Sequence, residues 1–146
     1  MITAAFDPGL TTGYVIFDND KPFKYGQVKF LELVTLVESL PTPDVVVYEN
    51  FELFKHKAKQ QIGSKFETVQ AIGIIISWCK RNGADLIEQR PTIKPIAQKW
   101  TGMVPTGSHN TNSHWIDAYN HGMYYLCRQG IAKTLLEQEH EAKNDL

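Results

Sequence analysis

The sequence of 146 residues has little of three features that would point to particular protein classes: cysteine, long apolar runs and net charge. Its two cysteines, Cys79 and Cys127, lie in patterns typical of helices and show no paired spacing. We therefore expect buried free thiols in a reducing compartment, without a disulfide framework or a zinc site. No apolar run is long enough to span a membrane, and the N-terminus lacks the pattern of a secretory signal. These absences predict a cytoplasmic protein that does not associate with membranes.

The formal net charge of −1 conceals an uneven charge distribution. Residues 1–54 carry eight acids against three lysines, whereas residues 55–100 carry nine lysines and arginines against three acids. A basic face beside an acidic cluster suits a polyanionic substrate that is handled by a cation-dependent site. Surface charge also segregates without any partner, so this distribution alone does not assign a function.

The hydrophobic pattern predicts an α/β fold in which a mixed five-stranded sheet is flanked by helices. Three antiparallel strands come first, and parallel strands follow. We expect one domain over residues 1–131, and residues 132–146 form a charged tail or a helical extension. The predicted strands cover residues 2–6, 13–17, 23–30, 45–49 and 84–89, and the predicted helices cover residues 31–40, 64–82, 93–100 and 113–130.

The helix predicted over residues 64–82 is expected to begin at Ser64, which has capping-box spacing with Glu67. Its sequence is rich in apolar residues, and one set of them recurs at helical spacing. The predicted buried face consists of Phe66, Val69, Ile72, Gly73, Ile76 and Cys79.

Acidic residues end two of the predicted strands. Asp7 follows the first apolar run, directly before the Pro8-Gly9 turn, and Glu49 ends the fourth strand. If these two strands lie side by side and parallel, their carboxyl ends meet and the two acids become neighbours. Asp7 alone is equally well explained as a turn residue, and Glu49 as a solvent-facing acid at a strand end.

The last helix opens with three polar residues, His114, Asp117 and His121, at positions i, i+3 and i+7, so they project from one face. If its first turns lie over the two strand ends, the predicted catalytic and metal site consists of Asp7, Glu49, His114 and Asp117. Crowded carboxylates need neutralisation, and oxygen-rich sites select Mg²⁺ or Mn²⁺, here two ions. Asp117 also suits a first helical turn, and His114 the surface. His121 either supports the site from behind or is a packed core histidine.

The segment after Glu49 is the expected DNA contact. Lysines there offer contacts to phosphates, and phenylalanines offer stacking or wedging against bases. The alternative is a mobile loop whose lysines serve solubility and whose aromatic residue packs in the core. The predicted DNA-binding residues are Phe51, Phe54, Lys55, Lys57, Lys59, Lys65 and, on the next short helix, Lys94.

Four features occur together in this order: Phe6-Asp7-Pro8-Gly9 with Thr12-Gly13; Val47-Tyr48-Glu49; the basic loop with the helix through Gln70-Ala71-Ile72-Gly73; and His114-Trp115-Ile116-Asp117-Ala118. The ordered set resembles the RuvC family of Holliday-junction resolvases, within the ribonuclease H-like superfamily, and its phage-type endonucleases most. The family's three acids fall on Asp7, Glu49 and Asp117. Its usual fourth acid is His114 here, a departure that some members share.

The resemblance implies a homodimeric endodeoxyribonuclease that binds Holliday junctions and other branched DNA and makes paired nicks, in the cytoplasm of a bacterium or a phage-infected host. It implies that Asp7 bridges two metal ions, and that His114 either ligates metal or acts as a general base. Two alternatives remain open at this point. One is a RuvC-like nuclease that processes RNA, and the other is a catalytically weak protein that only binds junctions.

Overall fold

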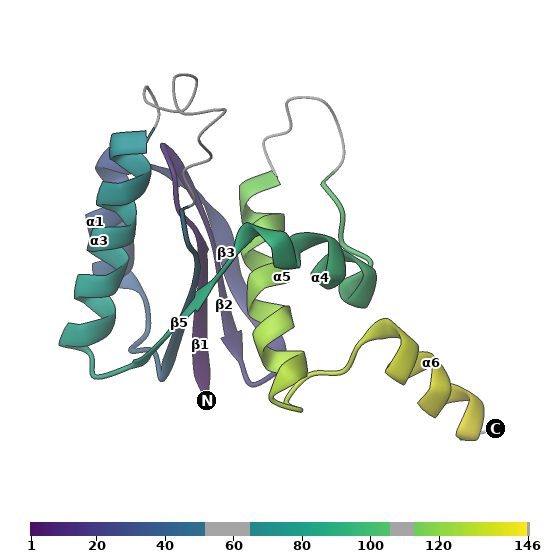
Figure 1. The fold of residues 1–146 in the computed structure, drawn as a ribbon. Helices are drawn as coiled ribbons and strands as arrows, with labels where there is room; N and C mark the ends of the chain where they lie inside the picture. Colours follow the sequence, from purple (N-terminus) through teal and green to yellow (C-terminus); the bar gives the residue numbers. More distant parts are fainter. Residues whose placement is uncertain (52–64, 106–112, 146) are drawn as a thin grey trace.

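The computed structural model describes residues 1–51, 65–105 and 113–145, and of Lys65 the backbone alone. The chain forms one mixed five-stranded sheet with helices on both faces (Figure 1). The strand order is β3-β2-β1-β4-β5, so the first strand lies at the centre of the sheet. The predicted fold class is confirmed.

The first three strands form an antiparallel meander, and the last two join the sheet in parallel to β1. The pairing of β1 with β4 places Phe6 opposite Tyr48, one residue before the carboxyl end of each strand. Parallel strands are commonly apolar on both faces, and the run of three valines in β4 follows that rule. The strands are β1 (Ile2–Asp7), β2 (Thr11–Asp18), β3 (Lys21–Lys29), β4 (Val45–Glu49) and β5 (Asp85–Gln89).

Two helical layers enclose this sheet. Helices α1 (Leu33–Ser39) and α3 (Lys65–Arg81) cover one face, and α4 (Lys94–Thr101) and α5 (Ser113–Arg128) lie on the other (Figure 1). Short 3₁₀ turns lead into α1 and α4. No helix in the described ranges has the length and apolar character that crossing a membrane requires.

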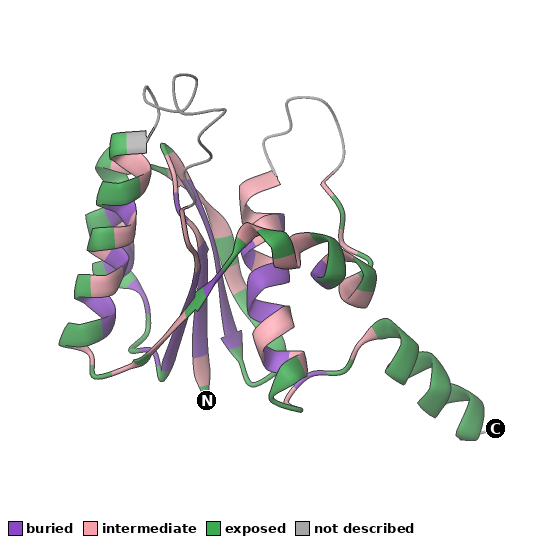
Figure 2. Cartoon of the chain, in the orientation of Figure 1, coloured by how far each residue is buried: buried purple, intermediate pink, exposed green. Residues whose placement is uncertain are grey.

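The hydrophobic core is divided by the sheet into two parts, because successive residues of a strand point to opposite faces. Phe6 points to the α1 and α3 side, where its ring meets Trp78 edge-on with centroids 6.0 Å apart. Ala5, Phe17 and Leu126 lie in the cluster under α5. Figure 2 shows the buried strands between the two helical layers. The sheet is therefore anchored from both sides.

The predicted buried face of α3 is only partly confirmed. Phe66 and Val69 are exposed, and Gly73 lies on the outer side, whereas Ala71, Ile75, Trp78 and Cys79 face the sheet. The helix carries apolar residues around most of its circumference, so spacing alone could not identify the inner stripe. Cys79 is buried, and Ile72 and Ile76 pack partly buried against the core, as expected. The outer side consequently exposes large apolar side chains. The other thiol, Cys127 on α5, is only partly buried.

The C-terminal residues form a separate helix, α6 (Leu135–Asn144), which extends away from the sheet (Figure 1). Thr134 caps it by accepting a hydrogen bond from the backbone N–H of Glu137. The sequence left a tail and a helical extension as alternatives for this segment. The structure has a short helix whose side chains are mostly exposed.

Candidate functional site

Two carboxylates meet at the carboxyl ends of the neighbouring inner strands β1 and β4. Asp7 is the last residue of β1 and Glu49 the last residue of β4. Because Phe6 pairs with Tyr48, the next residues along the two parallel strands are these two acids. Both side chains are largely shielded from solvent. Strand pairing therefore brings Asp7 and Glu49 together, as the sequence predicts.

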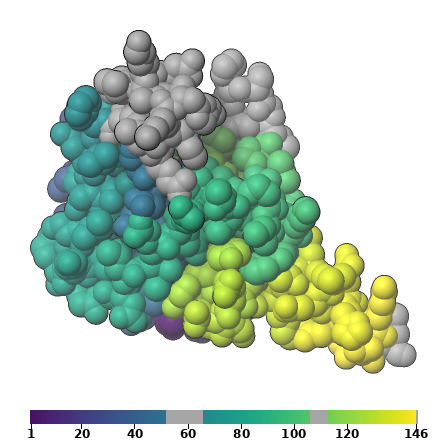
Figure 3. All heavy atoms as spheres, in the orientation of Figure 1, coloured from purple at the N-terminus to yellow at the C-terminus, as the bar shows by residue number. Residues whose placement is uncertain are grey.

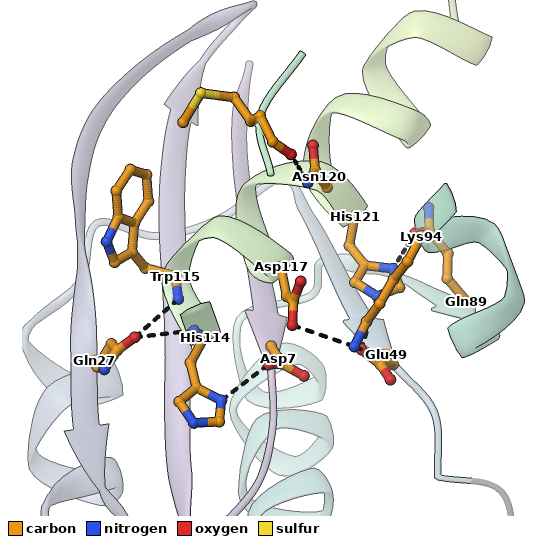
Figure 4. Close-up of polar contacts among 11 residues, drawn as sticks. Asp7, Gln27, Glu49, Gln89, Lys94, His114, Trp115, Asp117, Asn120 and His121 are labelled. Carbon is orange, nitrogen blue, oxygen red and sulfur yellow. Dashed lines mark hydrogen bonds and ion pairs between the residues drawn. The ribbon is translucent and has the colours of Figure 1, made fainter. Parts of the chain in front are cut away.

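Helix α5 brings the remaining predicted residues to the same edge (Figure 4). Nδ1 of His114 lies 3.2 Å from Oδ2 of Asp7, and His121 donates from Nε2 to Oε2 of Glu49 at 2.9 Å. Asp117 lies between these two histidines on the helix. The spacing i, i+3 and i+7 thus places the three side chains over the strand ends.

The ammonium group of Lys94 lies between two of the carboxylates. Its Nζ is 3.0 Å from Oε2 of Glu49 and 3.3 Å from Oδ2 of Asp117. Burial disfavours the charged ammonium, but attraction from Asp7, Glu49 and Asp117 outweighs it and raises the pKa of Lys94 above its ordinary value. The sequence did not predict these contacts, because they depend on where the start of α4 packs against α5.

The surroundings of the site shift the pKa values of Asp7 and Glu49 in opposite directions. Burial raises the pKa of Asp7 to about 6, and the hydrogen bond from His114 only partly offsets that effect. Burial also acts on Glu49, but the hydrogen bond from His121 and the charge of Lys94 prevail and lower the pKa of Glu49 to about 2. The partners of Glu49 thus outweigh the cost of burying its negative charge. The partners of Asp7 do not outweigh the cost of burying its negative charge.

His121 is completely buried, and both of its ring nitrogens have partners. Nδ1 lies 2.7 Å from Oε1 of Gln89, at the end of β5, while Nε2 contacts Glu49. The ring therefore links the ends of β4 and β5 and fixes the orientation of the Glu49 carboxylate. Of the two interpretations from the sequence, this geometry favours a supporting residue. Gln89 was missed, because a glutamine that ends a strand carries no distinctive signal.

A glutamine from the edge strand holds the start of α5. Oε1 of Gln27 accepts hydrogen bonds from the backbone N–H groups of His114 at 3.0 Å and Trp115 at 3.3 Å. The first N–H groups of a helix have no partner within the helix, so this side chain supplies one for each. Gly13 allows the close approach, because a Cβ there would lie 2.0 Å from the carbonyl oxygen of His114. Nothing in the sequence pattern indicated the role of Gln27.

Most of the predicted DNA-binding residues cannot be placed. Phe54, Lys55, Lys57 and Lys59 lie outside the described residues, as does the side chain of Lys65. Phe51, at the start of this segment, is half-buried and follows the end of β4 by two residues. Of the predicted DNA-binding residues that precede α3, only Phe51 is therefore placed near the carboxylates by the described structure.

The donor set is suited to an oxygen-preferring divalent cation. Asp7, Glu49 and Asp117 supply three carboxylates against the single ammonium of Lys94, and burial, with a smaller contribution from the charges of Glu49 and Asp117, raises the pKa of Asp7. The ammonium group of Lys94 already lies between Glu49 and Asp117. Within residues 1–51, 65–105 and 113–145, no three acidic, histidine or cysteine side chains are arranged to hold an ion as they stand. The chemistry fits Mg²⁺ or Mn²⁺, but ligation requires the Lys94 side chain to move aside.

Two solved structures of Thermus thermophilus RuvC are similar to this chain. One is described as T. thermophilus RuvC in complex with Holliday junction substrate, with a TM-score of 0.60 and 16% identity, covering 92% of this chain and 99% of the other. The second, T. thermophilus RuvC, has a TM-score of 0.63 at 16% identity, with coverage of 92% and 100%. The chain has a RuvC-like fold. No protein-family model and no curated protein matches the sequence.

The RuvC-like fold places the ends of β1 and β4 at the centre of the sheet, next to the start of α5. A site at the centre of a sheet has neighbouring residues on both sides. On the β5 side these are His121 and Gln89, and on the β3 side the neighbour is Gln27. The acidic cluster is consequently held by four strands and two helices. Such support limits side-chain motion in the site.

Proposed function

We propose that this chain is a divalent-cation-dependent endonuclease that cleaves branched DNA, above all four-way Holliday junctions, by hydrolysing phosphodiester bonds. The observation that carries the proposal is the meeting of Asp7, Glu49 and Asp117 at the carboxyl ends of β1 and β4, beside His114. Similarity in fold to a RuvC whose structure contains a Holliday junction substrate supports the choice of DNA as substrate.

Asp7, Glu49, Asp117 and His114 would hold the cation, with Asp7 central because burial opposes its ionised form and a bound cation would compensate that cost. Two Mg²⁺ or Mn²⁺ ions, when bound, supply a more acidic water and stabilise the attacking and leaving oxygens of the phosphodiester. His121 orients Glu49 and is fully shielded from solvent. His114 is partly exposed, and its hydrogen bond to Asp7 raises its pKa above the ordinary value, which makes the ring a stronger proton acceptor.

Substrate contacts are proposed for the basic region that follows β4. Residues 55–100 carry a charge excess of six, from nine basic and three acidic residues. Phe51 and Phe54 would contact unstacked bases, and the lysines of this region, including Lys55, Lys57, Lys59 and Lys65, would contact phosphates. We further propose a homodimer of the phage-type RuvC class, with a nuclease domain over residues 1–131, acting in the cytoplasm of a bacterium or a phage-infected cell.

A second candidate is a protein that binds junctions without cutting them. The contacts of Lys94 favour it, because an ammonium that satisfies Glu49 and Asp117 can stabilise an acidic cluster that no longer ligates metal. The two candidates differ in one measurable respect. A binding protein would keep its junction affinity in every cation and release no nicked product.

The decisive experiment is nicking of a synthetic four-way junction, a flap and a linear duplex in Mg²⁺, Mn²⁺ or EDTA. We expect the wild type to nick the branched substrates with either cation and not in EDTA. Asp7→Asn should lower the rate roughly 1,000-fold or more, which corresponds to about 4 kcal/mol of transition-state stabilisation. Asp20→Asn, in an exposed turn, is the matched control and should cleave normally.

Three outcomes would redirect the assignment. Metal-dependent cleavage that survives in Asp7→Asn would refute the site. Tight junction binding without cleavage in any cation would support the second candidate. Cleavage confined to a branched RNA of the same sequence would make the chain an RNA-processing nuclease.

The basic region is tested separately by salt dependence. Each lysine that contacts a phosphate contributes about one unit to the slope of log affinity against log salt. Lys57→Ala and Lys59→Ala should each reduce the slope for junction binding by about that amount. Lys143→Ala, on α6, is the control that should leave the slope unchanged.

A further inference from the structure

Two aromatic rings lie together at the start of α5, on the side that faces the edge strand β3. The rings of Tyr25 and Trp115, here called the aromatic pair, have centroids 4.7 Å apart at an interplanar angle of 34°. Trp115 is partly buried, whereas Tyr25 is 59% exposed although Trp115 covers one face of its ring. The second face of the Tyr25 ring is therefore open to solvent.

The aromatic pair adjoins the carboxylate cluster. Trp115 follows His114 in the chain, and Oε1 of Gln27 accepts hydrogen bonds from the backbone N–H groups of both. Figure 4 shows the His114 ring directed toward Asp7 and the Trp115 indole directed away from it. The basic segment that is expected to contact DNA follows β4, on the other side of β1. The aromatic pair is thus a separate surface beside the same cluster.

The edge strand β3 is strongly basic. It carries three lysines and no acidic residue, and none of the lysines forms an ion pair with any residue that the structure describes. Lysines on an edge strand discourage pairing with a strand of another protein. They also attract phosphates, so the surface around the aromatic pair favours a polyanion over a protein partner. The three residues are Lys21, Lys24 and Lys29.

One of these lysines shares a face with the aromatic pair. Successive strand residues point to opposite faces, so Tyr25, Gln27 and Lys29 lie on one face of β3, and the contacts of Gln27 identify it as the α5 face. The strand register aligns Gln27 with Gly13 and Gly13 with Asp7. The α5 face of β3 therefore presents an open aromatic ring and an exposed lysine on either side of the position level with Asp7.

We propose that the aromatic pair binds one nucleobase of the DNA strand that reaches the carboxylate cluster, stacked on the open face of Tyr25, and that Lys29 contacts a phosphate of that strand. Every nucleobase has an aromatic face, so stacking binds unpaired DNA of any sequence. Trp115 holds the Tyr25 ring in place before DNA binds, which lowers the entropy lost on binding. Bases within an intact duplex are already stacked, so the pair selects strands that are unpaired or opened at a branch.

This proposal deepens the proposed function and rests on it for the identity of the substrate. Binding is measured in EDTA, where the proposed nuclease does not cut. A chain that binds DNA through Tyr25 but never nicks a junction would refute the nuclease and retain the stacking site. A chain that nicks junctions but binds equally well without the Tyr25 ring would do the reverse. The two failures are therefore distinguishable.

The first test compares variants in their affinity for single-stranded DNA, measured by fluorescence anisotropy of a labelled oligothymidylate. Tyr25→Ala should raise the dissociation constant roughly tenfold or more, which is the loss expected for one stacked base. Tyr25→Phe keeps the ring and should bind within about twofold of the wild type.

Matched controls remove exposed apolar side chains elsewhere. Phe23 is 52% exposed on the same strand, but it lies beside Asp18 and Asp20, at the opposite end of the sheet from the cluster. Leu136 is exposed on α6, which projects from the body of the molecule (Figure 3). Phe23→Ala and Leu136→Ala should bind as the wild type does. Unchanged affinity of Tyr25→Ala, an equal loss in Phe23→Ala, or a wild type that binds no single-stranded DNA would each overturn the proposal.

The second test separates contact with a base from contact with the backbone. A strand of the same length made of abasic sites carries the phosphates without the bases. Tyr25→Ala should leave the affinity for this abasic strand unchanged, whereas Lys29→Ala should weaken both strands and reduce the salt slope for each by about one unit. If Tyr25→Ala weakened both strands equally, the ring would serve only to anchor the start of α5, and the stacking site would be refuted.

Discussion

Helices α3 and α5 pack on opposite faces of the same sheet and depart from the usual amphipathic pattern in opposite ways. Helix α5 buries polar side chains, among them Asn120 and His121, whereas α3 exposes the apolar side chains of Phe66 and Val69. Burying polar side chains and exposing apolar ones both lower the stability of an isolated chain. The contacts that the buried polar side chains of α5 make beside the carboxylate cluster explain the first departure.

The buried polar residues of α5 are fully engaged. Thr101 donates to Oδ1 of Asn120 at 2.6 Å, and the amide nitrogen of Asn120 donates to the Met103 carbonyl at 2.9 Å. These bonds fix the end of α4 against α5, as His121 fixes Glu49. The exposed apolar residues of α3 have no corresponding cover within the described chain. Hydrogen bonds thus compensate the polar groups that α5 buries, whereas the apolar groups on the outer side of α3 stay exposed in the described chain.

The largest expected effect separates the inner and outer sides of α3. Trp78→Ala should lower the free energy of unfolding by about 3–5 kcal/mol, because the indole is buried against Phe6. Phe66→Ala should change it by less than about 0.5 kcal/mol, since that ring is exposed in the isolated chain. Urea denaturation at submicromolar concentration, where self-association contributes little, measures both values. Equal losses would contradict the described orientation of α3.

The second effect is a gain in stability at the carboxylate cluster. The pKa of Asp7 is raised from 3.8 to about 6, so the folded chain holds this proton more tightly than the unfolded chain does. Stability from this group is present below about pH 4 and is lost as pH rises through about 6. Asp7→Asn removes the cost of the ionised form and should stabilise the metal-free protein at pH 8 by as much as about 3 kcal/mol.

Thermal unfolding in EDTA at several pH values checks this prediction. The advantage of Asp7→Asn should be large at pH 8 and nearly absent at pH 4. Mg²⁺ should then stabilise the wild type and leave the variant unchanged, because a cation binds only the folded cluster. A variant less stable than the wild type at pH 8 in EDTA would show that Asp7 is adequately compensated.

Contacts that follow from strand pairing could be predicted from the sequence, whereas side-chain contacts between elements far apart in the chain could not. The proximity of Asp7 and Glu49 was predictable, because parallel pairing brings strand ends together. The contacts of Lys94 with Glu49 and of Gln27 with the start of α5 were not, since they depend on the placement of elements far apart in the chain. The inner face of α3 was only partly predicted, because apolar residues occur around most of that helix.

The third effect concerns the buried histidine of α5. His121→Leu preserves much of the side-chain volume but leaves Glu49 with one donor fewer and Gln89 without its ring partner. An unsatisfied buried polar group costs about 1–3 kcal/mol, so we expect a loss of about 2 kcal/mol in a urea titration at pH 7. His140→Leu, on exposed α6, is the control and should be nearly neutral. Equal stability of His121→Leu would argue for a purely packing role.

The smallest effect tests how β3 holds the start of α5. Gln27→Leu removes the acceptor shared by the N–H groups of His114 and Trp115 and should cost about 1 kcal/mol, as loss of a helix N-cap does. Gln27→Glu keeps an acceptor and adds a negative charge favoured at a helix N-terminus, so it should retain full stability. Amide hydrogen exchange should quicken at His114 and Trp115 in the leucine variant alone. Uniform quickening along α5 would instead show that Gln27 stabilises the whole helix and does not specifically position the residues beside Asp7.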